Sequence, residues 1–366
     1  RTMIDAGITS FYKTDNGWRQ YYDFETQSYR PVKISDNIVS LKSAKDAGKA
    51  AISRRSATLV DLDDGVFCLE FHTKMNTLDV EIIDLLDESI AYVDHNGVGL
   101  VIGNQASGVP GAFSAGADLK GMLAAAKEKR YADIEAMVAH LQKTLQKAKY
   151  APFPVVTAPF GLTLGGACEI CLASDRIVAN AELYTGLVEI GVGLLPAGGG
   201  CLNLMRKYLA TLPESVTDVD IARYFIPVFM NIAMAKVSSS AADARANGFL
   251  GTMDRIVFNR DYLIGEAKKE VLKMWADGYV PPKNQKVTVA GESAQGMIAA
   301  ELFNMQSGGF VSEYDTFLAK RIAFVISGGE VRANSQVDEA VILTLERQAF
   351  IDFLKEEKTL ARMEHL

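Results

Sequence analysis

The stretch from Gly161 to Gly200, GLTLGGACEICLASDRIVANAELYTGLVEIGVGLLPAGGG, most constrains what this chain can fold into. It sets two acidic residues, Glu169 and Glu189, in apolar surroundings between two clusters of glycine. Glu169 closely follows a Gly-Gly pair, where a turn into a helix leaves backbone N–H groups unpaired. Glu189 is the only charge in LVEIGVGLL. We therefore expect a pair of carboxylates beside a backbone anion site.

Composition bounds the class of protein. A length of 366 residues suits one large domain with an appendage, or two domains. The formal charge of -7 argues against nucleic-acid binding, which needs a basic surface. No apolar run approaches the roughly 20 residues of a membrane helix, so we expect no integral membrane segment. The 4 cysteines are too few for a disulfide framework, which favours a reducing compartment and a cytoplasmic location.

Several other kinds of site are disfavoured. Cys168 and Cys171 form a C-x-x-C, but their apolar surroundings favour two small residues on a buried helix over a redox pair. The 4 histidines are scattered without metal-ligand spacing, so no metal site is expected. Neither a Ser/His/Asp nor a Cys/His arrangement is recognisable.

Hydrophobic patterning divides the chain into three expected parts. Residues 1–56 mix aromatic and polar residues and form a leading segment. Over 57–258 short apolar strands alternate with helices, which predicts parallel pairing and an α/β class. Residues 259–366 show mainly helical periodicity, with one strand-like interruption at 277–291. The last part is therefore expected to be a helical C-terminal region.

The central part contains the clearest local predictions. Residues 57–72 alternate around Asp-Asp-Gly, the pattern of a hairpin. A helix is expected over 78–93, ending before the His-Asn-Gly that follows. Residues 99–104 and 154–158 are expected as buried strands, with an amphipathic helix over 134–148 between them.

Two segments are expected to free backbone N–H groups for a ligand. In SAGAD, residues 114–118, small side chains let the backbone approach closely. The second segment is LGGA, residues 164–167. One amide from each, Ala117 and Gly166, could converge on one carbonyl oxygen and stabilise negative charge there. Either motif alone is weak, because most Gly-rich strand-to-helix turns only solve a packing problem.

The acids also have plainer interpretations. A glutamate such as Glu169 in the first turn of any helix interacts favourably with the helix dipole. Glu189 by itself would be a strand-end charge that reaches water. The three glycines at 198–200 would only let a helix start close to the sheet.

The order of three motifs resembles the crotonase superfamily, and the sequence is similar to an enoyl-CoA hydratase. The motifs are AFSAGADLKGM at 112–122, GLTLGGACEICLASD at 161–175 and TGLVEIGVGLLPAGGG at 185–200. The resemblance covers about 57–258 and, more loosely, the tail. It implies a crotonase-type ββα spiral core with a helical C-terminal region.

The resemblance also implies roles for individual residues in an acyl-CoA site. The amides of Ala117 and Gly166 would polarise the thioester carbonyl. Glu169 would mainly activate water and Glu189 would deliver a proton to C2. The resemblance supports the involvement of both acids better than it supports this assignment of their roles. Residues matching the CoA-binding segment of the family are Ala115, Ala117, Asp118, Leu119 and Lys120. Lys120 alone would equally be a solvated lysine at a helix start.

The leading segment, especially AGITSFYKTDNGWRQYYDFETQSY, resembles the closing part of a 3-hydroxyacyl-CoA dehydrogenase. This implies the C-terminal portion of a bifunctional β-oxidation protein. No cofactor is expected in this portion, and NAD is expected only with an N-terminal dehydrogenase domain that the sequence lacks. A homo-oligomer and a thiolase partner are left open as partners.

Two departures from the family pattern concern the wall of the acyl pocket. Leu187-Val188 stand where a polar residue and proline are common, and Pro159-Phe160 replace Val-Asn. Other activities on the same scaffold stay open, namely an enoyl-CoA isomerase and an acyl-CoA thioester hydrolase. A non-catalytic acyl-CoA-binding or assembly subunit is the alternative of another class.

Overall fold

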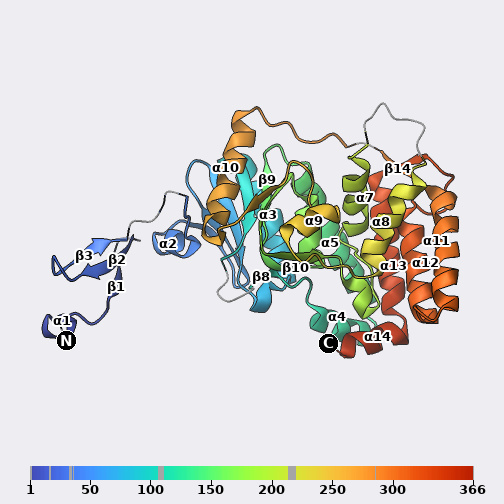
Figure 1. Ribbon diagram of the computed structural model, residues 1–366, viewed down its shortest axis with the longest axis horizontal. Coiled ribbons are helices and arrows are strands. Elements are labelled where there is room, and N and C mark those ends of the chain that lie inside the picture. The colour runs from blue at the N-terminus through green and yellow to red at the C-terminus, as the bar shows by residue number, and fades with distance from the viewer. Residues whose placement is uncertain are drawn as a thin grey trace.

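The computed structural model describes residues 2–15, 18–32, 35, 37–105, 111–212, 220–284 and 286–365. A large sheet of seven strands forms the core of the central part (Figure 1). Its neighbours are parallel from β13 to β6 and antiparallel from β6 to β4. In order across the sheet the strands are β13 (Arg255–Val257), β11 (Arg176–Asn180), β9 (Val155–Ala158), β7 (Gly99–Gly103), β6 (Val66–Phe71), β5 (Ala57–Asp61) and β4 (Ala50–Ser53).

A second sheet of three parallel strands has the order β12-β10-β8. The chain alternates between the sheets, because each of β7, β9 and β11 is followed by a strand of the small sheet. Helices follow these small-sheet strands, which gives the repeated ββα unit of the expected spiral. The elements are β8 (Ala112–Ser114), α4 (Leu119–Lys127), α5 (Tyr131–Lys149), β10 (Gly161–Leu164), α6 (Gly166–Ala173), β12 (Leu183–Gly186), the 3₁₀ helix η2 (Glu189–Val192) and α7 (Gly200–Leu209).

The central strands are apolar because both of their faces are covered. Every residue of β7 and β9 is buried, as expected for parallel strands inside an α/β domain. β5 and β6 form the predicted hairpin, with Asp61 opposite Phe67. Asp63, Asp64 and Gly65 all have positive φ in its turn.

The helix predicted over 78–93 is longer at its C-terminal end, where the prediction was wrong. α3 (Val80–Asn96) ends only at Gly97. The side chains of His95 and Asn96 bond to the carbonyl oxygens of Ala91 and Tyr92, four residues earlier. These local bonds stabilise one more helical turn than the His-Asn-Gly sequence suggested.

The C-terminal part is helical, as predicted. Its strand-like interruption is β14 (Val287–Val289), which pairs antiparallel with β15 (Ser335–Val337). α12 and α13 pack against each other, and α13 also contacts α5 and α7 of the spiral. The helices from residue 220 onward are α8 (Ala222–Ala233), α9 (Ala241–Ala246), η3 (Arg260–Tyr262), α10 (Leu263–Ala276), α11 (Gly291–Ser307), α12 (Glu313–Ile326), α13 (Glu339–Leu354) and α14 (Glu357–Glu364).

The leading residues form a small antiparallel sheet that stands at one end of the molecule in Figure 1. β4 also lies before residue 56, yet it is the edge strand of the large sheet. The expected domain boundaries at residues 56 and 258 stay predictions. The leading elements are α1 (Thr2–Asp5), β1 (Tyr12–Asp15), β2 (Trp18–Asp23), β3 (Ser28–Pro31) and α2 (Leu41–Asp46), and η1 (Lys74–Asn76) precedes α3.

Within the described ranges, no helix combines the length and the apolar character that crossing a membrane requires.

The contact of α10 with the large sheet can be tested at Gly99 on β7. A β-carbon at Gly99 would lie 2.3 Å from Cγ1 of Val271 and 3.0 Å from the carbonyl oxygen of Pro154. Gly99→Ala should therefore overpack this contact and lower the free energy of unfolding by about 1–3 kcal/mol, measured by urea denaturation. Gly296→Ala is the control, since a β-carbon there meets nothing within 4 Å. A Gly99→Ala protein as stable as wild type would contradict this packing.

Candidate active site

Glu169 lies in the first turn of α6, immediately beyond the small sheet. The helix can start there because its N-cap residue, Gly165, adopts φ 56° and ψ -126°, a backbone conformation that residues with a β-carbon disfavour. Only 3% of Glu169 is exposed. Its Oε1 accepts hydrogen bonds from the backbone N–H groups of Gly198 and Gly200, both at 2.8 Å. The glycine cluster at 198–200 therefore binds the carboxyl group of Glu169, which follows the glycine pair at 165–166.

The glycines of this cluster are required by the closeness of the carboxyl group. A β-carbon on Gly198 would lie 2.7 Å from Oε2 of Glu169, and one on Gly200 would lie 2.8 Å from Oε1. Real β-carbons do not approach oxygen so closely, so any side chain would displace Glu169. Sequence reasoning attributed these glycines only to helix packing and missed this contact.

Burial sets the ionisation of Glu169. Loss of water raises the pKa of its carboxyl group to about 7, although the amides of Gly200 and Gly198 act in the opposite direction. This agrees with general physics, since burial disfavours the charged form and N–H donors favour it. At neutral pH the group is therefore poised between its acid and its base form.

Glu189 begins the 3₁₀ helix η2 and approaches Glu169 from the end of β12. Its Oε1 would lie 3.2 Å from a β-carbon on Gly165, so this carboxyl group rests against the N-cap of α6. Its Oε2 is buried and has no hydrogen-bond partner among the described residues. Burial and the charge of Glu169 hold its pKa well above the usual range. The two expected acids thus meet at one place, and the pKa of each is raised.

The backbone nitrogens of Ala117 and Gly166 also lie near this place. Leu78 donates to the carbonyl of Gly116 and accepts from the N–H of Asp118, which fixes the chain on both sides of Ala117. No hydrogen bond from either the Ala117 or the Gly166 N–H occurs among the described groups. A β-carbon on Gly166 would lie 3.9 Å from both the Ala117 nitrogen and Glu169 Oε2.

The residues expected to contact CoA lie beside this amide. Ala115, Asp118 and Lys120 are exposed, and Leu119 is half-buried at the start of α4. The Asp118 carboxylate caps that helix by accepting from the N–H of Gly121 at 3.2 Å. No described carboxylate pairs with Lys120. The ammonium group of Lys120 therefore stays available to an anion, and the CoA-binding role of the segment stays a prediction.

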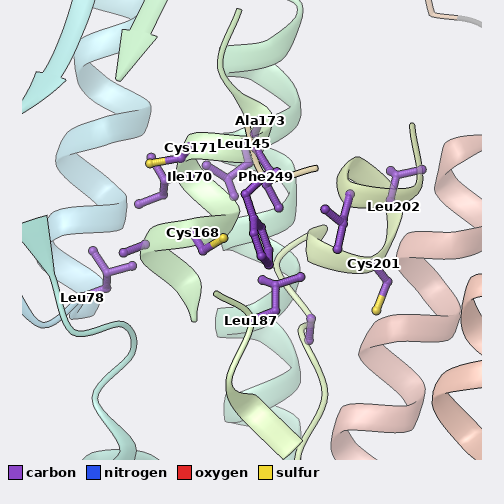
Figure 2. Close-up of a cluster of buried hydrophobic side chains, with 14 of the residues drawn as sticks. Leu78, Leu145, Cys168, Ile170, Cys171, Ala173, Leu187, Cys201, Leu202 and Phe249 are labelled. Carbon is purple, nitrogen blue, oxygen red and sulfur yellow. The ribbon is translucent and has the colours of Figure 1, made fainter. Parts of the chain in front are cut away.

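The apolar packing behind the acids comes from several separate parts of the chain. Figure 2 shows Cys168, Ile170, Cys171 and Ala173 of α6 among Leu78, Leu145, Leu187, Cys201, Leu202 and Phe249. All four cysteines are free and buried, and burial raises the pKa of the Cys171 thiol to about 12. Cys168 and Cys171 thus act as small apolar residues on a buried helix, as predicted.

Sequence reasoning missed a third buried carboxyl group, Glu346 on α13. Its Oε2 accepts from the N–H of Gly199 and its Oε1 from the N–H of Leu202, both at 2.9 Å. Burial and the charge of Glu169 raise its pKa well above the usual value. A signal existed in the sequence, because Glu346 interrupts the apolar face that includes Ile342, Leu343, Ala349, Phe350 and Phe353.

Over the residues that the structure describes, no three His, Cys, Asp or Glu side chains are grouped so that they could hold a metal ion.

Comparison with known proteins bears on the family and the fold of the chain. Residues 61–213 match the family model described as enoyl-CoA hydratase/isomerase. These residues form an enoyl-CoA hydratase/isomerase domain. Solved structures with the same fold include an enoyl-CoA hydratase from Bacillus halodurans (TM-score 0.57, 16% identity, covering 85% of this chain and 100% of that one). Another is a carnitinyl-CoA dehydratase from Mycobacterium thermoresistibile (TM-score 0.60, 15% identity, covering 85% and 89%).

Curated relatives extend the similarity beyond the enoyl-CoA hydratase/isomerase domain. A probable 3-hydroxyacyl-CoA dehydrogenase of Bacillus subtilis is 38% identical over 366 residues, which is 100% of this chain and 45% of that protein. A putative fatty acid oxidation complex trifunctional enzyme of Rickettsia prowazekii is 26% identical over 89% of this chain and 41% of its own length. The chain thus spans less than half of each relative.

The raised pKa of Glu169 predicts a pH-dependent stability. Between its ordinary pKa of 4.5 and about 7, the folded state keeps a proton that the unfolded state releases. The free energy of unfolding should therefore fall as pH rises through this window, by about 3 kcal/mol from this group. Urea denaturation at both ends of the window should show a smaller fall for Glu169→Gln than for wild type. Equal falls in the two proteins would contradict the raised pKa.

Proposed function

We propose that this chain catalyses the reversible hydration of 2-enoyl-CoA thioesters to 3-hydroxyacyl-CoA, as in fatty acid β-oxidation. The observation that supports this most is the meeting of two carboxyl groups, those of the buried Glu169 and the half-buried Glu189, at the N-terminus of α6. Hydration needs both a proton acceptor and a proton donor near the double bond. The family of residues 61–213 points the same way.

In the proposed reaction the backbone carries the developing charge. Addition of water at C3 of a conjugated thioester gives the carbonyl oxygen enolate character. The unpaired N–H groups of Ala117 and Gly166 would donate to that oxygen. Such fixed donors need no reorganisation during the reaction, which is why they stabilise the transition state effectively.

The two acids would divide the proton transfers. Glu169, with a pKa of about 7 and two amide donors on one oxygen, suits the base that takes a proton from water. Glu189, with its pKa held well above the usual range, suits the acid that delivers a proton to C2. A double-bond shift needs only one such group, so the second acid favours hydration over isomerisation.

The activity of the whole protein is a wider proposal. The names of the relatives support a bifunctional protein that also has 3-hydroxyacyl-CoA dehydrogenase activity. NAD would then belong to a dehydrogenase domain outside this chain. The CoA moiety would lie along Ala115, Asp118, Leu119 and Lys120. A homo-oligomer, a thiolase partner and a cytoplasmic location remain part of the same proposal.

Substitution of either acid tests the hydratase assignment. Glu169→Gln and Glu189→Gln should each slow the loss of enoyl-thioester absorbance by about 100-fold or more, because each removes one proton-transfer group. The exposed Glu182→Gln serves as control. Unimpaired turnover in both variants would contradict the assignment. Product analysis separates the alternatives, which would give a shifted double bond, free CoA, or bound CoA thioester without turnover.

The contact between the glycine turn and Glu169 gives a second test. Gly198→Ala should lower kcat by about 10-fold to 100-fold, because its methyl group would push the carboxyl group out of position. Gly191→Ala is a close control, since a β-carbon there meets nothing within 4 Å. Initial rates at saturating substrate measure the difference. Equal rates for the two variants would mean that Glu169 does not depend on this contact.

A further inference from the structure

We propose that Glu346 of α13 is a positioning residue. It orients the backbone turn of residues 198–202 so that two amides of this turn bind Glu169. This inference rests on the proposed hydratase function. Glu346 makes no hydrogen bond to Glu169, and its two hydrogen bonds come from the turn. It acts through the turn, so the helical C-terminal region would complete the active site.

The turn is shared between the two carboxyl groups in alternation. Gly198 and Gly200 donate to Glu169, whereas Gly199 and Leu202 donate to Glu346. The alternation depends on Gly199, whose φ of 107 lies in the left-handed region. Successive amides of such a turn form a concave anion site. Here neighbouring amides point to opposite sides, and each side is occupied by a carboxyl group.

The burial of Glu346 is hard to attribute to stability alone. The residue is 0% exposed, and no described Lys, Arg or His pairs with it. A buried carboxyl group without a cation destabilises a fold unless hydrogen bonds satisfy it. Both of its oxygens accept from the turn, so its partners are the amides next to those that hold Glu169. An apolar residue would pack in a helix face like this but would leave those amides unpaired.

The position of α13 relative to the turn is fixed by further bonds. Gln142 on α5 donates to the carbonyl oxygens of both Ala197 and Leu343, which join the turn to α13. Arg347 donates to Oε1 of the same Gln142 at 2.6 Å. Closer to the start of α13, Glu339 forms an ion pair with Lys149 at 2.8 Å. The carboxyl group of Glu346 is therefore held on a rigid support.

The ionisation of Glu169 reports the alignment of the turn. The amides of Gly200 and Gly198 lower its pKa, so a loosened turn should let that pKa rise. The titratable groups that interact with it are Glu189 from η2, Glu346 from α13, Cys168 from α6 and Cys201 from α7. From α5, the side chain that lies beside Glu169 at Gly198 is the apolar Leu141.

Glu346→Gln tests the proposal because it keeps the size of the side chain. The glutamine has one acceptor oxygen for two amides, and its NH₂ group would face a backbone N–H. We expect kcat for enoyl-CoA hydration to fall about 10-fold to 100-fold, with KM within about twofold of wild type. The pKa of Glu169 can be measured by NMR titration of protein labelled at the glutamate carboxyl carbons, with the Glu169 signal assigned from its loss in Glu169→Gln. In Glu346→Gln the titration midpoint of Glu169 should rise by about half a pH unit or more.

The direction of that shift separates positioning from a direct charge effect. Loss of a carboxylate charge at Glu346 would by itself lower the pKa of Glu169, and loss of a protonated carboxyl group there would exert no charge effect on that pKa. A lowered or unchanged midpoint in Glu346→Gln would therefore overturn the proposal. Glu346→Asp keeps a carboxyl group but withdraws it from the turn, so it should also raise the Glu169 midpoint and lower kcat.

Glu339→Gln is the matched control. Glu339 is a buried carboxyl group two helical turns earlier on α13, but it pairs with Lys149 and Arg206 instead of the turn. The Glu339→Gln substitution should lower the melting temperature but leave the titration midpoint of Glu169 unchanged. A rise of this midpoint equal to that in Glu346→Gln would overturn the proposal. A wild-type chain without hydratase turnover would refute the proposed function, while the NMR midpoints would still decide the role of Glu346.

Discussion

The shared backbone turn between Glu169 and Glu346 is the interaction on which this site depends. A carboxyl group in an apolar core is costly unless it is neutralised or bonded. Two such groups lie here on opposite sides of residues 198–202, and each accepts two of the amides. The turn can serve both because glycines leave room for oxygen atoms where a β-carbon would stand. The same turn therefore supplies hydrogen-bond donors to both buried acids.

The spiral fold accounts for how residues so far apart meet. The three strands of the small sheet are parallel, so their C-terminal ends lie along one edge. Ala117 follows β8, Gly166 follows β10 and Glu189 follows β12. Ligands of open parallel sheets are bound at this end for the same reason. The large sheet contributes no acid to the site, and it acts as the buried layer on which the small sheet is supported.

The sequence allowed much of this to be predicted, and the limits have physical causes. Glu169 and Glu189 could be found because packing alone does not call for a lone charge in an apolar run next to paired glycines. The alternation of strands and helices predicted the α/β class, and Asp-Asp-Gly predicted the hairpin of β5 and β6. Glu346 was missed because a single acid on an otherwise apolar helix face has a meaning only when its partner is known. That partner is the backbone of residues 198–202, and its glycines do not indicate which distant side chain their amides bind.

The separation of the two halves of this site along the chain has a consequence for how it forms. Gly199 and Glu346 are 147 residues apart, and Leu202 and Glu346 are 144 residues apart. Contacts between such distant segments form late, because the loop between them must first be closed. During synthesis, the spiral would leave the ribosome with the turn at 198–202 bound on one side only, by Glu169. The active site would then be complete only when the last helices have been made and have docked.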